Sequence, residues 1–227
     1  MRTIYEEQSI DIIEQAAEDH GEGLHALISF GNESALLSRI IKLAGVPVEY
    51  VTIDSGFRMP GTDSFQTRLS NMDGFEPHIY GPAEEDVRTI KAVELWETDL
   101  DRYHEITRYE PLRRAIGERG ITGLLSGVRY GQTAHRATMD VIGPGVAGET
   151  RIHPLLHWPE EQAELYFDRH GLLRHPQYYQ GYGSVGDWTT TKRGEGRQGR
   201  GLHNGECGLH VNEEGRLVRS AAGLGTA

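Results

Sequence analysis

The sequence has little cysteine, few long apolar runs and a shortage of positive charge, and each shortage excludes a class of protein. Its 227 residues include one cysteine, Cys207, so the chain can form no internal disulfide and cannot by itself ligate an iron–sulfur cluster. No stretch approaches the 18 or so apolar residues that a membrane helix needs. Asp and Glu outnumber Lys and Arg by 34 to 23, for a net charge of −11, which argues against non-specific binding to nucleic acid.

The remaining composition is that of an ordinary globular protein. Hydrophobic residues make up 37% of the chain and charged residues 25%, and a chain of this length can bury a core. The first residues lack the apolar centre of a signal peptide, and a lone cysteine suits a reducing compartment. We therefore expect a cytoplasmic protein without a membrane partner.

Alternating apolar and amphipathic segments predict an α/β fold. An apolar strand, a helix and a second strand follow one another near the N-terminus, which implies parallel strands joined by a right-handed crossover. Periodicity is lost from Tyr178 onward, where glycines are dense. We expect a doubly wound, mostly parallel sheet in a domain of residues 1–187 and a loop-rich segment at 188–227. Strands are predicted at 24–30, 48–54, 77–80, 121–127 and 151–155, and helices at 3–20, 35–43, 63–71, 95–117 and 159–170.

Three predicted strands end in polar segments, where open parallel sheets bind their ligands. The first is a loop of small residues that enters a helix, a geometry that favours an anion although many folds use such turns for shape alone. The second carries an aspartate that suits a ribose or an amine but also caps turns. The third contains two arginines, which can bind sulfate or phosphate or can simply lie on the surface. The candidate residues are Ser29, Phe30, Gly31, Asp54, Ser55, Gly127, Arg129, Gln132 and Arg136.

The C-terminal segment combines a basic stretch with the lone cysteine. Lys192, Arg193, Arg197 and Arg200 suit a small polyanion, and a solvated loop is the simpler alternative. Cys207 lies between Glu206 and Gly208, which leaves packing, a mixed metal site or nucleophilic chemistry as its role. A zinc site from His203, Cys207 and His210, completed by His25 or His135, lacks the paired short spacings of structural sites. We expect no bound metal.

These segments, taken in order from about Leu27 to His210, resemble the phosphoadenylyl-sulfate (PAPS) reductase family of the adenine nucleotide α-hydrolase-like fold. Ser29-Phe30-Gly31 is similar to the family's modified pyrophosphate loop, and Glu206-Cys207-Gly208-Leu209-His210 to its catalytic signature. The other matching blocks are Ile53–Thr62, Leu95–Glu97, Tyr109–Ala115, Ser126–Ala137, His153–Leu155, His175–Pro176 and Gly181–Asp187.

The resemblance implies a reaction and a set of partners. In the family, the cysteine attacks the sulfur of PAPS and forms an S-sulfonate, which thioredoxin or glutaredoxin releases as sulfite. It implies Cys207 as nucleophile, with Glu206 and His210 beside it, and the basic stretch as a source of the positive field that a thiolate needs. Family members are often dimeric, so a homodimer is a further expectation.

Several differences bear on the substrate. Relatives that reduce adenylyl sulfate usually carry cysteines for a [4Fe–4S] cluster, but this chain has Tyr130-Gly131 and Trp188–Thr191 at those places, so PAPS is expected and no cluster. Tyr130 and Gly205 replace residues that are usually basic, which puts thiolate activation or affinity in question. The alternatives are a cluster-free adenylyl-sulfate reductase, another sulfur-transfer enzyme of this fold, or a non-catalytic nucleotide- or zinc-binding module.

Overall fold

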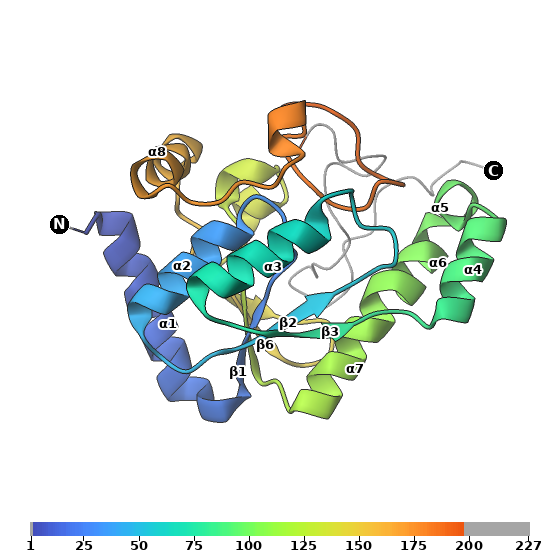
Figure 1. The fold of residues 1–227 in the computed structure, drawn as a ribbon. Helices are drawn as coiled ribbons and strands as arrows, with labels where there is room; N and C mark the ends of the chain where they lie inside the picture. The colour runs from blue at the N-terminus through green and yellow to red at the C-terminus, as the bar shows by residue number, and fades with distance from the viewer. Residues whose placement is uncertain (1, 198–227) are drawn as a thin grey trace.

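The computed structural model describes residues 2–197, which form a six-stranded sheet flanked by helices (Figure 1). The strand order is β3-β2-β1-β4-β6-β5. Neighbouring strands run parallel except for the edge strand β5, which is antiparallel to β6. The strands are β1 (Leu24–Leu27), β2 (Glu49–Ile53), β3 (Pro77–Tyr80), β4 (Gly123–Ser126), β5 (Ile142–Pro144) and β6 (Thr150–Ile152).

The helices begin and end at recognisable sequence signals. Thr3 and Glu6 form a capping box at the start of the first helix, and glycines in the left-handed conformation end four others, at Gly45, Gly74, Gly120 and Gly171, where a side chain would be strained. The helices are α1 (Ile4–His20), α2 (Ser34–Ala44), α3 (Thr62–Asp73), α4 (Glu84–Ala92), α5 (Leu95–Thr98), α6 (Leu100–His104), α7 (Glu110–Arg119) and α8 (Glu160–His170), with a π-helical turn at Glu105–Tyr109.

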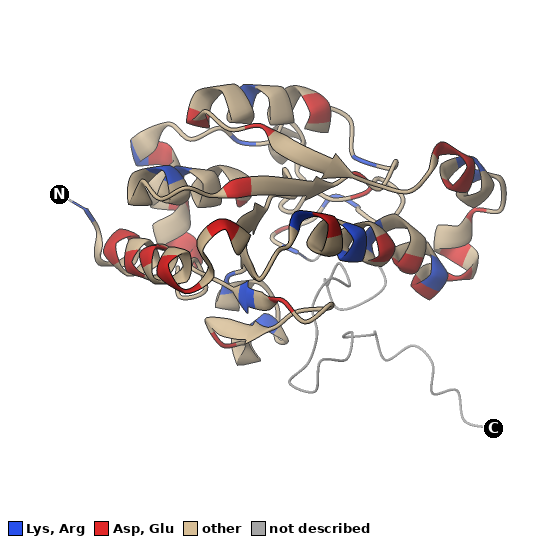
Figure 2. Ribbon diagram, turned by 90° about the horizontal axis from the view of Figure 1, so that it is seen from below, with Lys and Arg blue, Asp and Glu red and all other residues tan. Residues whose placement is uncertain are grey.

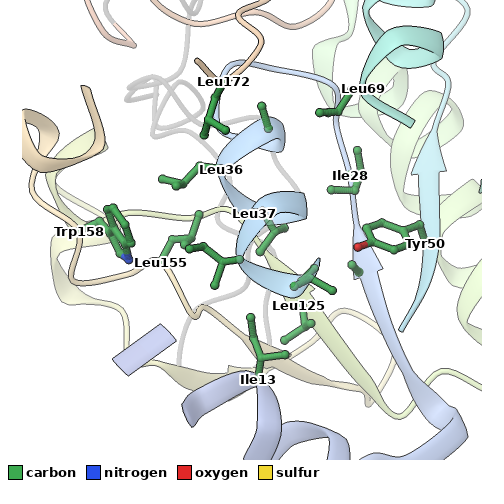
Figure 3. Close-up of a cluster of buried hydrophobic side chains, with 14 of the residues drawn as sticks. Ile13, Ile28, Leu36, Leu37, Tyr50, Leu69, Leu125, Leu155, Trp158 and Leu172 are labelled. Atoms are coloured by element: carbon green, nitrogen blue, oxygen red, sulfur yellow. The ribbon is translucent and has the colours of Figure 1, made fainter. Parts of the chain in front are cut away.

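Apolar side chains fill both faces of the sheet. The larger cluster lies where α1, α2, α3 and α8 cover one face, with Leu36 and Leu37 of α2 in the same cluster as Ile28 and Leu125 (Figure 3). On the other face, Leu112 and Ile116 of α7 pack against strands β2 and β4. Burial of this apolar area is the main stabilising contribution, at about 25 cal/mol per Å². The predicted doubly wound architecture is confirmed.

Three elements differ from the prediction. Strand β5 lies where the sequence predicts a loop, because its three residues, Ile-Gly-Pro, show no alternation and the isoleucine is exposed. Helix α4 has no counterpart among the predicted helices, since its nine residues bury only Ile90. The expected long helix at 95–117 is divided into α5, α6, the π-helical turn and α7. Among the described residues, no helix is long and apolar enough to span a bilayer.

The sheet has its topological switch point between β1 and β4. The chain adds β2 and β3 on one side of β1, and β4, β6 and β5 on the other. Connections leaving β1 and β4 therefore diverge and leave a crevice beyond their carboxyl ends, which is the usual ligand site of such sheets. The boundary predicted at residue 187 stays a prediction; Trp188 donates its backbone N–H to Phe57 O at 2.9 Å.

Candidate functional site

A cavity opens at this switch point and is rich in arginine. Its lining includes Ser29, Gly31 and Ser34 from the β1–α2 connection and Gly127 after β4. Although the protein is acidic overall, with several Asp and Glu positions along α1 (Figure 2), guanidinium groups converge here. The arginines in the lining are Arg58, Arg108, Arg136, Arg151 and Arg197. Several guanidinium groups with planar donor arrays are suited to phosphate or sulfate oxygens.

The most elaborate contact in the wall is the buried pair of Arg108 and Asp187. Arg108 Nη2 donates to Asp187 Oδ2 at 2.6 Å, Tyr103 Oη donates to the same oxygen at 2.8 Å, and Ser55 Oγ donates to Oδ1 at 2.6 Å. Burial would raise the pKa of Asp187, but Arg108 and the hydrogen bonds outweigh it and lower that pKa to about 2. Asp187 is therefore ionised at neutral pH and joins three distant segments at the cavity.

Two other arginines are also held by carboxylates. Arg58 Nη2 lies 2.8 Å from Asp54 Oδ2 and 2.7 Å from Asp63 Oδ1. Arg151, in strand β6, donates from Nε to the fully buried carboxylate of Glu149 at 2.8 Å. Glu149 also accepts backbone N–H bonds from the β5–β6 turn. Such bonds fix the direction of a long side chain before any ligand arrives, which reduces the entropy lost on binding.

The β1–α2 connection reaches the cavity through a strained residue. Phe30 has φ of +52°, in the left-handed region that residues other than glycine seldom adopt, and its side chain is fully buried in the main core. Anchored in this way, Phe30 turns the chain so that its neighbours Ser29 and Gly31 line the cavity. The side chain of the next residue, Asn32, donates to Gly183 O at 3.0 Å and so holds this connection against the segment at Gly183.

A second carboxylate, Glu33, stands between the cavity and a neighbouring hollow and lines both. Its Oε1 accepts hydrogen bonds from Gln132 Nε2 at 2.8 Å and from Arg129 Nη2 at 3.3 Å. Burial would raise the pKa of Glu33, but Arg129 and Arg197 reverse that effect and lower it. Arg129 is buried and also lies 2.8 Å from Glu160 Oε2. It is therefore shared between two carboxylates.

The cavity brings together some of the residues predicted from the sequence. Ser29, Gly31, Ser55, Gly127, Arg136 and Arg197 line it. The others do not line it: Phe30 is in the core, Asp54 holds Arg58, Arg129 and Gln132 hold Glu33, and Lys192 and Arg193 are exposed. Arg200, Glu206, Cys207 and His210 lie outside the described residues, so their predicted roles stay predictions.

Sequence reasoning missed Glu33, Arg58, Arg108, Arg151 and Asp187. Arg58 and Asp187 belong to segments that were recognised as motifs, so a search for charged residues within those motifs would have found them. Arg108 lies in the π-helical turn, a feature frequent at functional sites but invisible in the sequence. Arg151 looked like an ordinary strand residue. Only the fold shows that its side chain reaches the same cavity.

The zinc alternative gains no ligand cluster from the described part of the chain. Residues 2–197 contain no group of three or more His, Cys, Asp or Glu side chains that could hold a metal ion. His25, one of the suggested ligands, is buried in β1, with its Nδ1 donating to Gly23 O at 3.3 Å. That contact lies at the amino end of β1, whereas the cavity lies beyond the carboxyl end.

Comparisons with known proteins agree with the fold. The family model of the phosphoadenosine phosphosulfate reductase domain matches residues 23–193. The phosphoadenosine 5′-phosphosulfate reductase of Synechococcus sp. is 32% identical over 91% of this chain and 93% of its own length. That of Sodalis glossinidius is 31% identical over 80% and 78%.

Solved structures show that this chain and its relatives also share a fold. The PAPS reductase of Candida auris, solved as a phosphate complex, superimposes with a TM-score of 0.72 at 25% identity, covering 82% of this chain and 90% of its own. The FMN adenylyltransferase of Candida glabrata, at 13% identity and a TM-score of 0.63, covers 83% of this chain and 64% of its own and shares the fold alone. The chain therefore belongs to the phosphoadenosine phosphosulfate reductase family.

Proposed function

We propose that this protein reduces PAPS to sulfite and adenosine 3′,5′-bisphosphate, with Cys207 as the nucleophile. The observation that carries the proposal is the cavity at the switch point, lined by five arginines, in a chain of this family. PAPS carries a 3′-phosphate and a 5′-phosphosulfate, so a site for it needs several fixed cations. Guanidinium groups held in place by Asp187, Asp54 and Glu149 meet that need.

In the first step, the Cys207 thiolate attacks the sulfur of the sulfate group. An S–S bond forms, the bond from sulfur to the bridging oxygen breaks, and adenosine 3′,5′-bisphosphate leaves with that electron pair. The cavity arginines stabilise the negative charge that develops on the leaving phosphate. They also supply a positive field of the kind that lowers the pKa of a nearby thiol.

The second step requires thiols from another protein, because Cys207 is the chain's only cysteine. One thiolate of thioredoxin or glutaredoxin attacks Cys207 Sγ and displaces sulfite, which leaves with the electron pair of the S–S bond. The partner's second thiolate then attacks the mixed disulfide and restores Cys207. The partner loses two electrons and sulfur gains two. The two steps as proposed use no iron–sulfur cluster. A cluster takes several cysteine ligands, and this chain has one cysteine.

A mass measurement tests the covalent step. Incubation with PAPS in the absence of reductant is expected to add one SO₃ group at Cys207, and added thioredoxin is expected to remove it. The variant Cys207→Ser should gain no mass and release no sulfite. Sulfite release by Cys207→Ser at the wild-type rate would refute the mechanism. Rates with PAPS and adenylyl sulfate, measured side by side, decide which nucleotide is the substrate.

A matched pair of basic residues tests the cavity. Arg136 is buried and lines it, whereas Lys192 is exposed and does not. The variant Arg136→Gln should weaken binding of adenosine 3′,5′-bisphosphate by about tenfold or more, as expected for the loss of a charge-assisted hydrogen bond worth about 1.5–3 kcal/mol. Lys192→Gln should change it much less. Equal effects in a calorimetric titration would mean that the nucleotide binds elsewhere.

A further inference from the structure

Glu33 places a negative charge in a wall of the cavity that is otherwise built for anions. Glu33 lines the cavity together with Ser29, Gly31 and Ser34, next to the start of α2. Although Glu33 directly precedes that helix, its side chain accepts no hydrogen bond from the helix backbone. It is directed instead to Gln132 and Arg129. A need for helix capping therefore does not explain this acidic residue.

The backbone of the connection after β4 comes close to Glu33. A Cβ atom on Gly127 would lie 3.3 Å from Glu33 Cβ, so the connections that follow β1 and β4 meet closely at this point. The side chain is 24% exposed, and the pKa of Glu33 is lowered by Arg129 and Arg197 despite its burial. At neutral pH Glu33 is thus an ionised carboxylate beside the first turn of α2.

A phosphate chain is the ligand that this charge would affect most. Helix N-termini that open from a small-residue loop attract phosphate groups, and Ser34, the first residue of α2, lines the cavity. Each phosphoryl group added to a 5′-phosphate brings about one more negative charge to that corner. At an effective dielectric constant of about 20, two like charges several ångströms apart repel strongly enough to change affinity about tenfold.

We propose that Glu33 is a specificity-determining residue that discriminates against nucleotides with a 5′-diphosphate or 5′-triphosphate chain. The proposal rests on the proposed function only in taking the ligand to be an adenine nucleotide. It assigns to Arg129 and Gln132 the role of positioning residues that hold the Glu33 carboxylate at the wall. By this account the chain admits a single 5′-phosphoryl group with its sulfate and rejects the abundant ATP and ADP.

The test is a calorimetric titration of AMP, ADP and ATP, without divalent metal ions, into the wild type and the Glu33→Gln variant. The amide introduced by this substitution keeps an oxygen for the bond from Gln132 but removes the charge. Affinity in the variant should rise little for AMP, by about tenfold for ADP and by more for ATP. An equal change for all three nucleotides, or no change, would overturn the proposal. If Glu33→Gln does not fold, the shorter Glu33→Asn is expected to show the same graded gain.

Glu160 supplies the matched control. Its Oε2 lies 2.8 Å from Arg129 Nη2, yet its side chain is 64% exposed and does not line the cavity. Glu160→Gln therefore releases the same arginine without removing charge from the cavity wall, and should change the three affinities equally and slightly. A graded gain in this variant would assign the effect to Arg129 and would overturn the role of Glu33.

A fourth ligand separates this inference from the proposed function. Adenosine 3′,5′-bisphosphate, titrated into the wild type, should bind more tightly than ATP. Failure of the bisphosphate to bind, together with a graded gain in Glu33→Gln, would refute the proposed function and leave the role of Glu33 standing. Binding of the bisphosphate without a graded gain would do the opposite.

Discussion

Asp187 and Glu33 are both carboxylates paired with a buried arginine beside the same cavity, but their surroundings differ. Asp187 accepts hydrogen bonds on both oxygens from Ser55, Tyr103 and Arg108, and these partners come from two segments, the loop after β2 and the continuous helical stretch of α6 and the π-helical turn. Glu33 receives its bonds on one oxygen from Gln132 and Arg129, which are three residues apart, and Arg129 has Glu160 as a second partner. Asp187 connects parts of the fold, whereas Glu33 changes the charge of the cavity wall.

This difference has a general lesson about buried ion pairs. Removing one member of a deeply buried pair is costly, because the charge of the other member loses its compensation inside the protein. An arginine that is shared between two carboxylates, as Arg129 is, keeps a counter-ion when one of them is lost. The same chemical groups at the same cavity are therefore expected to contribute very differently to stability, and the following predictions measure that difference.

The largest effect is expected for Asp187→Ala. Loss of this carboxylate takes from the buried Arg108 its 2.6 Å ion pair and removes the acceptor of Ser55 and Tyr103. The free energy of unfolding should fall by about 3–5 kcal/mol, measured by urea denaturation. The exposed pair of Glu84 and Arg88, 3.7 Å apart, provides the control, because Glu84→Gln should have no measurable effect. A loss below about 1 kcal/mol for Asp187→Ala would remove the contrast with Glu33.

The effect of His175 on stability at acid pH must be known before the effects of the carboxylates can be compared. Its ring is fully buried, Nδ1 accepts from Gln177 N at 3.1 Å, and Nε2 therefore donates to Thr62 Oγ1 at 3.0 Å. Burial lowers the pKa of His175 from 6.5 to about 4. Between these two pH values the unfolded chain binds a proton that the folded chain does not, so stability falls as pH decreases, by about 3 kcal/mol in total.

Denaturation of His175→Gln across the same pH range checks this. The variant should lose the decline between about pH 6.5 and pH 4 that the buried ring causes. An unchanged slope would show that His175 is protonated equally in both states.

Below that range, Asp187 should control the acid response. Its folded-state pKa of about 2 lies below the ordinary value of 3.8, so the unfolded chain takes up a proton first as the pH falls. The stabilisation that Asp187 provides is complete above about pH 4 and is lost toward pH 2, at a cost of about 2 kcal/mol. Unfolding measured from pH 4 to pH 2 should be steeper in the wild type than in Asp187→Asn. Parallel curves would contradict the ionised state of Asp187.

The smallest effect on stability is expected for Glu33→Gln. Arg129 keeps Glu160 at 2.8 Å, and the new amide oxygen still accepts from Gln132. The free energy of unfolding should change by about 1 kcal/mol or less, in contrast to the large change in nucleotide selectivity proposed above. Urea denaturation of this variant beside Asp187→Ala tests the comparison directly. A loss as large as that of Asp187→Ala would make Glu33 a structural residue.

The sequence predicted the helices and strands that are recognisable from residues close together in the chain. Short apolar runs located five of the six strands, and amphipathic segments located most helices. Strand β5 was missed because its three residues carry no pattern, and it exists only through pairing with β6. The motif loops after β1 and β4 were recognised as polar segments at strand ends. That these two loops meet at Gly127 and Glu33 could be recognised only once the strand order was known.

The site was less accessible to sequence reasoning, for a physical reason. An arginine side chain is long, so the place of its guanidinium depends on which carboxylate holds it rather than on its position in the chain. Arg129 and Arg136 were predicted together, yet of these two only Arg136 lines the cavity, because Glu33 and Glu160 hold Arg129 to one side. Lys192 and Arg193, singled out by their charge, are exposed.

The sequence by itself determined the α/β class, the family and, through a single cysteine, the lack of any internal disulfide. These follow from composition, periodicity and ordered motifs, which are properties of neighbouring residues. The tertiary structure decided which charges meet. It brings Arg58, Arg108 and Arg151 to one cavity from a loop, a π-helical turn and a strand, and it sets Glu33 in that cavity as a fixed negative charge. Such encounters depend on strand order and on buried ion pairs between distant segments, which no local pattern records.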